Sequence, residues 1–88
     1  MRYAVIWRGG SQADLFATLN EAGDKQTVFA SAEVVTARLR RSPRQAGESR
    51  DTLERRVTFV AHLYVVFTVE RAARVVYIER VRWIGSLP

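Results

Sequence analysis

Residues 53–83 read LERRVTFVAHLYVVFTVERAARVVYIERVRW and are rich in valine, phenylalanine, tyrosine and isoleucine. These residue types favour extended structure, and the interruptions at Ala61-His62 and Arg71–Ala73 are short enough to be hairpin turns. Neither interruption contains an Asn-Gly type of signal, so the sequence leaves the turn geometry open. The stretch therefore predicts three consecutive antiparallel strands, at Leu53–Val60, Leu63–Glu70 and Arg74–Trp83.

A first helix is predicted upstream of these strands, beginning at Ser11. Ser11 is a suitable N-cap residue, and Asp14 is favourable near the positive end of a helix. Gly23 is a natural stop, because glycine readily takes the conformation that ends a helix. The apolar residues between these points recur at helical spacing, at Leu15, Leu19 and Ala22.

A second helix is predicted directly after the first, with Asp24 as its cap. It must end by Ser42, since the residue before Pro43 is biased away from helix. The tight joint at Gly23-Asp24 makes the two helices a hairpin. One apolar stripe runs along the second helix, formed by Val28, Ala32, Val35 and Leu39.

A short strand at Tyr3–Trp7 precedes both helices, and its continuous apolarity predicts burial on both faces. Residues 42–52 are polar and are expected to form a long loop. The order is therefore β-α-α-β-β-β in a single domain spanning residues 1–88. We expect an α+β fold in which a helical hairpin packs on one face of a mostly antiparallel four-stranded sheet.

The composition narrows the classes of function. With 88 residues, no cysteine and one histidine, the chain is too short for a two-domain enzyme and lacks thiolate or histidine-rich metal sites. The sequence indicates no cofactor and no metal. No apolar run approaches the roughly 20 residues of a membrane span, and no signal-peptide core is present. We therefore expect a soluble, cytoplasmic protein that does not bind a membrane.

The net charge of +5 is unevenly distributed. Residues 38–56 carry seven arginines against three acidic residues, and only one cation of the whole chain is a lysine. Arginine suits bidentate recognition of phosphate or carboxylate, although a GC-rich genome produces the same bias. Arginines interleaved with aromatic residues are typical of RNA-binding surfaces. A solvated sheet face explains the same pattern, and composition alone favours that structural interpretation over nucleic-acid binding.

Strand alternation predicts which of these arginines share a face. Arg80 and Arg82 have the same parity, and the opposite parity is shared by Tyr77, Glu79 and Trp83. Arg55 aligns with the apolar residues Val57 and Phe59, whereas Arg56 aligns with Thr58. Arg56 is therefore expected to be the solvent-facing member of the pair.

The chain resembles the RelE/ParE superfamily of bacterial type II toxins over nearly its whole length. The resemblance rests on the element order and on a series of phrases in the same order: YAVIW at 3–7, LRRSP at 39–43, GESR at 47–50, RRVTFV at 55–60, LYVVFTV at 63–69 and VVYIERVRW at 75–83. It implies a toxin made together with a labile antitoxin, in systems that also serve plasmid stabilisation. Members of the superfamily either cut mRNA in the ribosomal A site without a metal or poison DNA gyrase.

For an mRNA-cutting member, the resemblance implies a site of basic residues on the central strands. Arg56 and Arg80 lie where the family's phosphate-stabilising arginines fall, and Arg50 and Arg82 extend the predicted catalytic set. Further contacts to RNA or to a partner are expected from Arg44, Arg55, Tyr77 and Trp83.

A proton acceptor is not evident, because arginine stays protonated and the family's C-terminal histidine or tyrosine has no clear counterpart. Trp83 occupies that neighbourhood, and the remaining candidates are Glu79, Tyr64, Tyr77 and His62. The expected partners are a cognate antitoxin together with the ribosome and mRNA. DNA gyrase, or no target at all in a degenerate member, is the alternative. Homodimers and hetero-oligomers with the antitoxin both remain open.

Overall fold

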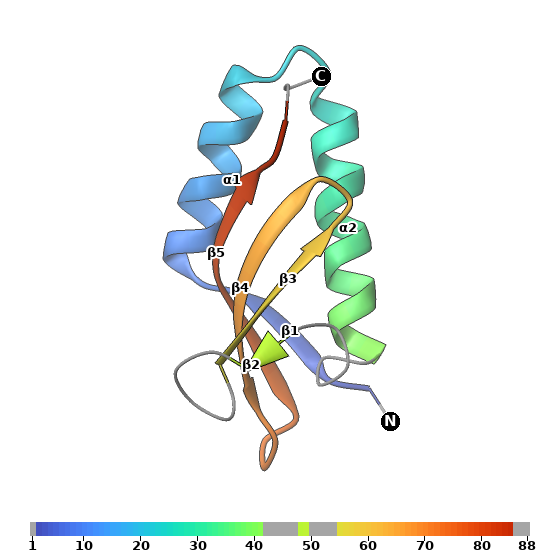
Figure 1. Ribbon diagram of the computed structural model, residues 1–88, viewed down its shortest axis with the longest axis vertical. Helices are drawn as coiled ribbons and strands as arrows, with labels where there is room; N and C mark the ends of the chain where they lie inside the picture. Colours follow the sequence, from blue (N-terminus) through green and yellow to red (C-terminus); the bar gives the residue numbers. More distant parts are fainter. Residues whose placement is uncertain (1, 42–47, 50–54, 86–88) are drawn as a thin grey trace.

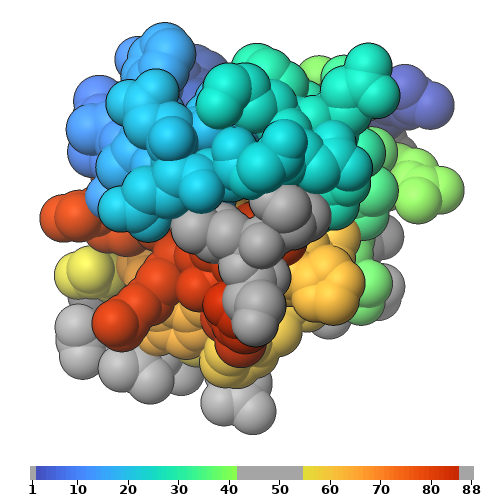
Figure 2. All heavy atoms as spheres, turned by 90° about the horizontal axis from the view of Figure 1, so that it is seen from above, coloured from blue at the N-terminus to red at the C-terminus, as the bar shows by residue number. Residues whose placement is uncertain are grey.

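The strands form one mixed sheet, and the two helices lie together on one side of it (Figure 1). The computed structural model describes residues 2–41, 48–49 and 55–85. The elements in chain order are β1 (Ala4–Trp7), α1 (Gly9–Glu21), α2 (Lys25–Arg41), β2 (Glu48–Ser49), β3 (Arg55–Val60), β4 (Leu63–Glu70) and β5 (Val75–Trp83). Viewed along the molecule, the helices make one layer and the strands the other (Figure 2). The predicted α+β architecture is confirmed.

The sheet order is β1-β5-β4-β3-β2. β1 runs parallel to β5, and the other neighbouring strands are antiparallel, so the expectation of a mostly antiparallel sheet is confirmed. β2 was not predicted and falls inside the expected loop 42–52, where Glu48 pairs with Val57 and Ser49 with Arg56. Two residues are too few to show an alternation, which is why a fifth strand was not predicted.

β1 is an edge strand, and this corrects the expectation that it is buried on both faces. Ala4 and Ile6 are exposed, whereas Val5 and Trp7 are partly buried against the core. The backbone N–H of Tyr3 donates to the carbonyl oxygen of Arg40 at 2.8 Å, which ties the start of β1 to the end of α2.

The second helix forms as predicted. Asp24 caps it, since its carboxylate accepts hydrogen bonds from the backbone N–H of Thr27 at 3.2 Å and from the Thr27 hydroxyl at 2.7 Å. These bonds hold the pKa of Asp24 below its ordinary value. All four residues of the predicted stripe are buried: Val28, Ala32, Val35 and Leu39. Burying one such side chain contributes about 1.5–3 kcal/mol, so this stripe fixes α2 on the sheet.

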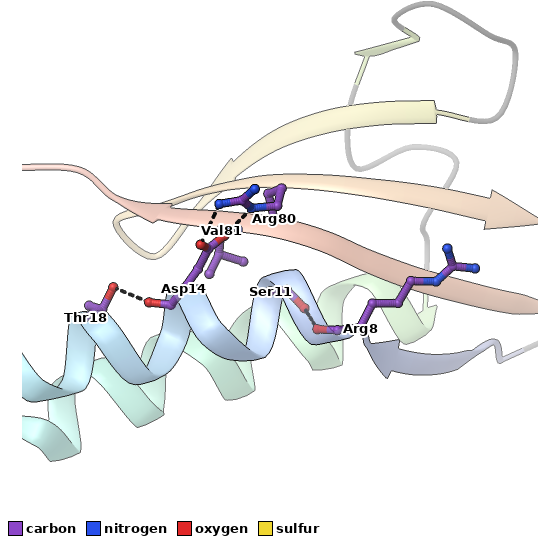
Figure 3. A network of polar contacts seen from close by, with 6 residues as sticks. All are labelled: Arg8, Ser11, Asp14, Thr18, Arg80 and Val81. Carbon is purple, nitrogen blue, oxygen red and sulfur yellow. Dashed lines mark hydrogen bonds and ion pairs between the residues drawn. The ribbon is translucent and has the colours of Figure 1, made fainter.

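The first helix starts two residues earlier than predicted, and Ser11 is not its cap. The N-cap residue is Arg8, and the buried Ser11 hydroxyl donates to the Arg8 carbonyl oxygen at 2.8 Å from within the first turn (Figure 3). A serine hydroxyl can satisfy itself on a carbonyl of the preceding turn as well as on a free N–H. Leu19 and Ala22 are buried as predicted, and Leu15 packs against them.

The turn between β3 and β4 has the mirror-image geometry that suits hairpins. Ala61 and His62 both have positive φ, at 50° and 70°. A two-residue turn with positive φ at both positions matches the right-handed twist of the flanking strands. Neither residue favours this conformation, which is why the sequence left the geometry open.

Candidate nucleic-acid interface

Side chains of β3, β4 and β5 line the face of the sheet that points away from the helices. The strand register places Phe59, Tyr64 and Arg82 in one row across the sheet and Arg55, Thr68 and Tyr77 in another. Phe59 is 67% exposed, and its ring lies 5.1 Å from that of Tyr64. This surface, termed the open sheet face, comprises Arg55, Val57, Phe59, Tyr64, Val66, Thr68, Tyr77 and Arg82.

A β-bulge in β5 decides which side chains reach the open sheet face. Val66 pairs with Arg80 and Phe67 with Ile78, so Glu79 is an extra residue in β5. The bulge inverts the alternation, and Tyr77 and Arg82 therefore share a face. The parity prediction that separated them is wrong, because an extra residue moves every later side chain of a strand to the other face.

The two arginines that begin β3 also exchange their predicted roles. Arg56 is in register with the buried Phe67 and is only partly exposed, whereas Arg55 is opposite Thr68 and exposed. The expectation that Arg56 is the solvent-facing residue is wrong. The reason lies further along the strand, where Thr58 is buried and Phe59 is exposed, although hydrophobicity suggests the reverse.

Three polar residues from three parts of the chain meet beside Tyr77 at the edge of this surface. The Thr68 hydroxyl donates to Glu79 Oε2 at 3.1 Å, and Arg8 Nη1 lies 3.4 Å from the same oxygen. The Arg8 guanidinium also stacks over the Tyr77 ring, 4.0 Å from its centroid, in a cation–π contact. This group, termed the Glu79 cluster, comprises Arg8, Thr68, Tyr77 and Glu79.

Arg8 is the site residue that sequence reasoning missed. It follows β1, and the pairing of Trp7 with Ile78 brings it next to Glu79. Nothing local in the sequence indicates that the first strand lies beside the last. A parallel partner is set by the fold as a whole, so only the assembled sheet reveals this contact.

A second arginine–carboxylate pair lies on the other side of the bulge, between β5 and α1 (Figure 3). Asp14 accepts hydrogen bonds from Arg80 Nε at 2.8 Å, from Arg80 Nη2 at 2.9 Å and from the backbone N–H of Val81 at 3.0 Å. The hydrogen bonds from Arg80 are the main cause of a lowered pKa at Asp14, and the pKa of Arg80 is correspondingly raised. We term this arrangement the Asp14 clasp.

The remaining predicted residues are distributed over several environments. Arg82 is exposed on the open sheet face. Trp83 is partly buried between the main core of the sheet and the smaller apolar cluster of the two helices, and its ring centroid lies 5.7 Å from that of His62. Arg44 and Arg50 lie outside the described residues. Within residues 2–41, 48–49 and 55–85, no three metal-binding side chains gather, and no helix is long and apolar enough to cross a membrane.

The structure is similar to two solved chains from toxin–antitoxin complexes. A chain of the RelBE2 complex from Mycobacterium tuberculosis has a TM-score of 0.76 at 19% identity, covering 94% of this chain and 99% of that chain. A chain of the chromosomal ParDE system from P. aeruginosa has a TM-score of 0.60 at 15% identity, covering 96% and 98%. No family model and no curated protein matches the sequence. The protein thus has the RelE/ParE fold, which confirms the fold expected from the resemblance.

Proposed function

We propose that this protein is the toxin of a type II toxin–antitoxin system and that it cleaves mRNA on the ribosome. The observation that carries the proposal is the open sheet face, where Arg55 and Arg82 flank the exposed ring of Phe59 and the partly exposed rings of two tyrosines. Arginine pairs with phosphate, and an exposed ring stacks on an unpaired base. The shared fold with chains of the RelBE2 and ParDE complexes supports the same assignment.

RNA can be cut by attack of a 2′-hydroxyl on the adjacent phosphate. The reaction needs a proton acceptor and cations around the phosphate, where negative charge develops. We assign the cationic role on the open sheet face to Arg55 and Arg82, whereas Arg56 lies on the opposite side of β3. Arg80 contributes less, because two of its nitrogens are already engaged by Asp14. Arg44 and Arg50 remain predicted contributors.

Induced expression in a bacterial host, with pulse labelling of protein synthesis and mapping of transcript ends, tests this function. We expect rapid arrest of protein synthesis together with cut transcripts. A DNA-damage response with filamentous cells would instead indicate a gyrase inhibitor, and unaffected growth would indicate a non-toxic binding module. Either result would contradict mRNA cleavage.

A double variant tests whether the toxicity depends on the open sheet face. Arg55→Ala with Arg82→Ala removes two exposed cations of this surface, and we expect it to restore growth. Arg38→Ala is the matched control, since Arg38 is equally exposed but lies in the last turn of α2. A double variant as toxic as the parent would contradict the location of the site.

We further propose a cognate antitoxin with an acidic segment that folds on binding and covers part of the open sheet face. The chain's net charge of +5 and the arginines of this face support an acidic partner. Isothermal titration against the product of the neighbouring gene tests the interaction. We expect binding at micromolar concentration or below, and an absence of heat at that concentration would contradict it.

A further inference from the structure

We infer that Glu79 is the proton acceptor of the cleavage reaction and that Arg8 binds the reacting phosphate beside it. This inference rests on the proposed function and supplies the proton-accepting group that the arginines cannot provide.

The carboxylate of Glu79 is held at one oxygen and available at the other. Oε2 receives the Thr68 hydroxyl at 3.1 Å and lies 3.4 Å from Arg8 Nη1. Oε1 makes no hydrogen bond with the part of the chain that the structure describes, and the side chain is 24% exposed. A general base needs this combination of fixed position and a reachable acceptor atom.

Arg8 is oriented for binding an anion at the same place. Its guanidinium is stacked on the Tyr77 ring at 4.0 Å, which restrains a long side chain that is 51% exposed. The guanidinium carries five N–H donors, and Nη1 makes its 3.4 Å approach to Glu79. The other donors can engage a phosphate in the planar, bidentate manner that arginine favours.

The proximity of the two groups matches the geometry of the substrate, whose 2′-hydroxyl and 3′-phosphate belong to one nucleotide. Glu79 Oε1 takes the 2′-hydroxyl proton while the O2′–P bond forms and the P–O5′ bond breaks. The departing O5′ takes a proton from water. The products are a 2′,3′-cyclic phosphate and a 5′-hydroxyl, and Glu79 then returns its proton to solvent.

Thr68 and Tyr77 are positioning residues in this account, since each acts through Glu79 or Arg8. Tyr77 contributes its ring face to the cation–π contact, so its hydroxyl is dispensable. Tyr77→Leu is therefore expected to lower the cleavage rate about tenfold through the lost cation–π contact, and Tyr77→Phe, which keeps a ring beneath Arg8, to restore most of this loss.

Single-turnover cleavage of ribosome-bound mRNA by the full chain tests the inference. We expect Glu79→Gln to lower the rate about 100-fold or more, which is the usual contribution of a general base, with RNA binding unchanged. Glu70→Gln is the matched control, because Glu70 is an exposed carboxylate at the end of β4 without a described partner, and it should leave the rate unchanged.

The outcomes separate this inference from the proposed function. A parent protein that leaves mRNA intact overturns both. A parent protein that cuts mRNA, with Glu79→Gln cutting within threefold of it, overturns only the assignment of Glu79. If Glu79→Gln fails to fold, the cleavage rates of the two Tyr77 variants test the inference. Equal rates for Tyr77→Phe and Tyr77→Leu would contradict the claim that the Tyr77 ring orients Arg8 for the reaction.

Discussion

Two arginine–carboxylate pairs meet at the bulge of β5, and they differ in nearly every respect that matters for chemistry. Glu79 and Arg80 are adjacent in sequence, yet Glu79 joins Arg8 in the Glu79 cluster while Arg80 joins Asp14 in the Asp14 clasp. Asp14 accepts three hydrogen bonds between 2.8 and 3.0 Å, one of them from backbone. Glu79 has one side-chain hydrogen bond and one contact at 3.4 Å.

The difference separates a structural pair from the pair that we propose to be reactive. The Asp14 carboxylate closes an otherwise open stretch of β5 by accepting the Val81 N–H, and it thereby fastens α1 to the sheet. A carboxylate that is fully engaged in this way has little capacity left for a substrate. Glu79 Oε1 accepts no hydrogen bond from the described residues, so one arginine–carboxylate pair serves folding on one side of the bulge and the other, we propose, serves catalysis.

The largest expected effect is on cleavage and compares the arginines of the two pairs. Arg8→Ala should lower the rate of mRNA cleavage about 100-fold, because it removes a cation from the developing negative charge. Arg80→Ala should lower it less than about tenfold, since two nitrogens of Arg80 are committed to Asp14. Single-turnover rates of both variants measure the contrast, and a greater loss from Arg80→Ala would reverse the roles of the two pairs.

For the stability of the fold, we expect the Asp14 clasp to matter more than the Glu79 cluster. Asp14→Ala leaves the N–H of the buried Val81 without its acceptor, and we expect a loss of about 1–3 kcal/mol in the free energy of unfolding. Glu79→Gln keeps an acceptor for the Thr68 hydroxyl and should cost less than about 1 kcal/mol. Urea denaturation at neutral pH measures both, and equal losses would remove the distinction between the pairs.

The pH dependence of stability should follow the Asp14 clasp. The pKa of Asp14 is lowered in the folded protein from an ordinary value of 3.8, mainly by its hydrogen bonds with Arg80. Its stabilisation is thus fully present above pH 3.8 and is lost as the pH falls through the lower folded pKa. Asp14→Asn should flatten this acid loss, leaving the part due to Asp24, whose pKa is also lowered. Urea denaturation at a series of acidic pH values measures the slope, and an unchanged slope would contradict the assignment.

The smallest expected effect concerns the close approach of α1 to the bulge. A Cβ at Gly10 would lie 3.0 Å from the Glu79 carbonyl oxygen and 3.2 Å from Arg80 Cδ, whereas a Cβ at Gly9 meets nothing within 4 Å. Gly9→Ala should therefore raise the free energy of unfolding by about 0.5 kcal/mol through helix propensity. Gly10→Ala should not be stabilising, because its Cβ would crowd the Glu79 carbonyl oxygen. Thermal unfolding should therefore occur at a higher temperature for Gly9→Ala than for Gly10→Ala. Equal stabilisation by both would show that the contact is loose.

Sequence patterns predicted the elements well and the faces of the strands poorly. The helical stripe from Val28 to Leu39 has one unambiguous period, so its burial followed directly. β3 and β5 carry apolar residues at both parities, and β5 also has an extra residue at Glu79. Alternation cannot locate a bulge, because the bulge depends on the partner strand.

The sequence predicted the surface on which the candidate site lies, but not all of the residues that form it. Arginines and aromatic residues on the last strands pointed to the surface that we propose as the site, and Glu79 was among the candidates for proton transfer. The hydrogen bonds between Asp14 and Arg80 join residues 66 positions apart in the sequence. The place of Arg8 beside Glu79 depends on the pairing of β1 with β5. Such contacts are set by tertiary structure and leave no local trace in the sequence.

Mapping the ends of ribosome-bound mRNA after addition of the purified protein tests whether the open sheet face is a ribonuclease site. We expect new fragments with 5′-hydroxyl ends and 2′,3′-cyclic phosphates from the parent protein, and none from the Arg55→Ala, Arg82→Ala double variant. Intact mRNA with the parent protein, or equal cutting by the double variant, would contradict the claim that the open sheet face is a ribonuclease site.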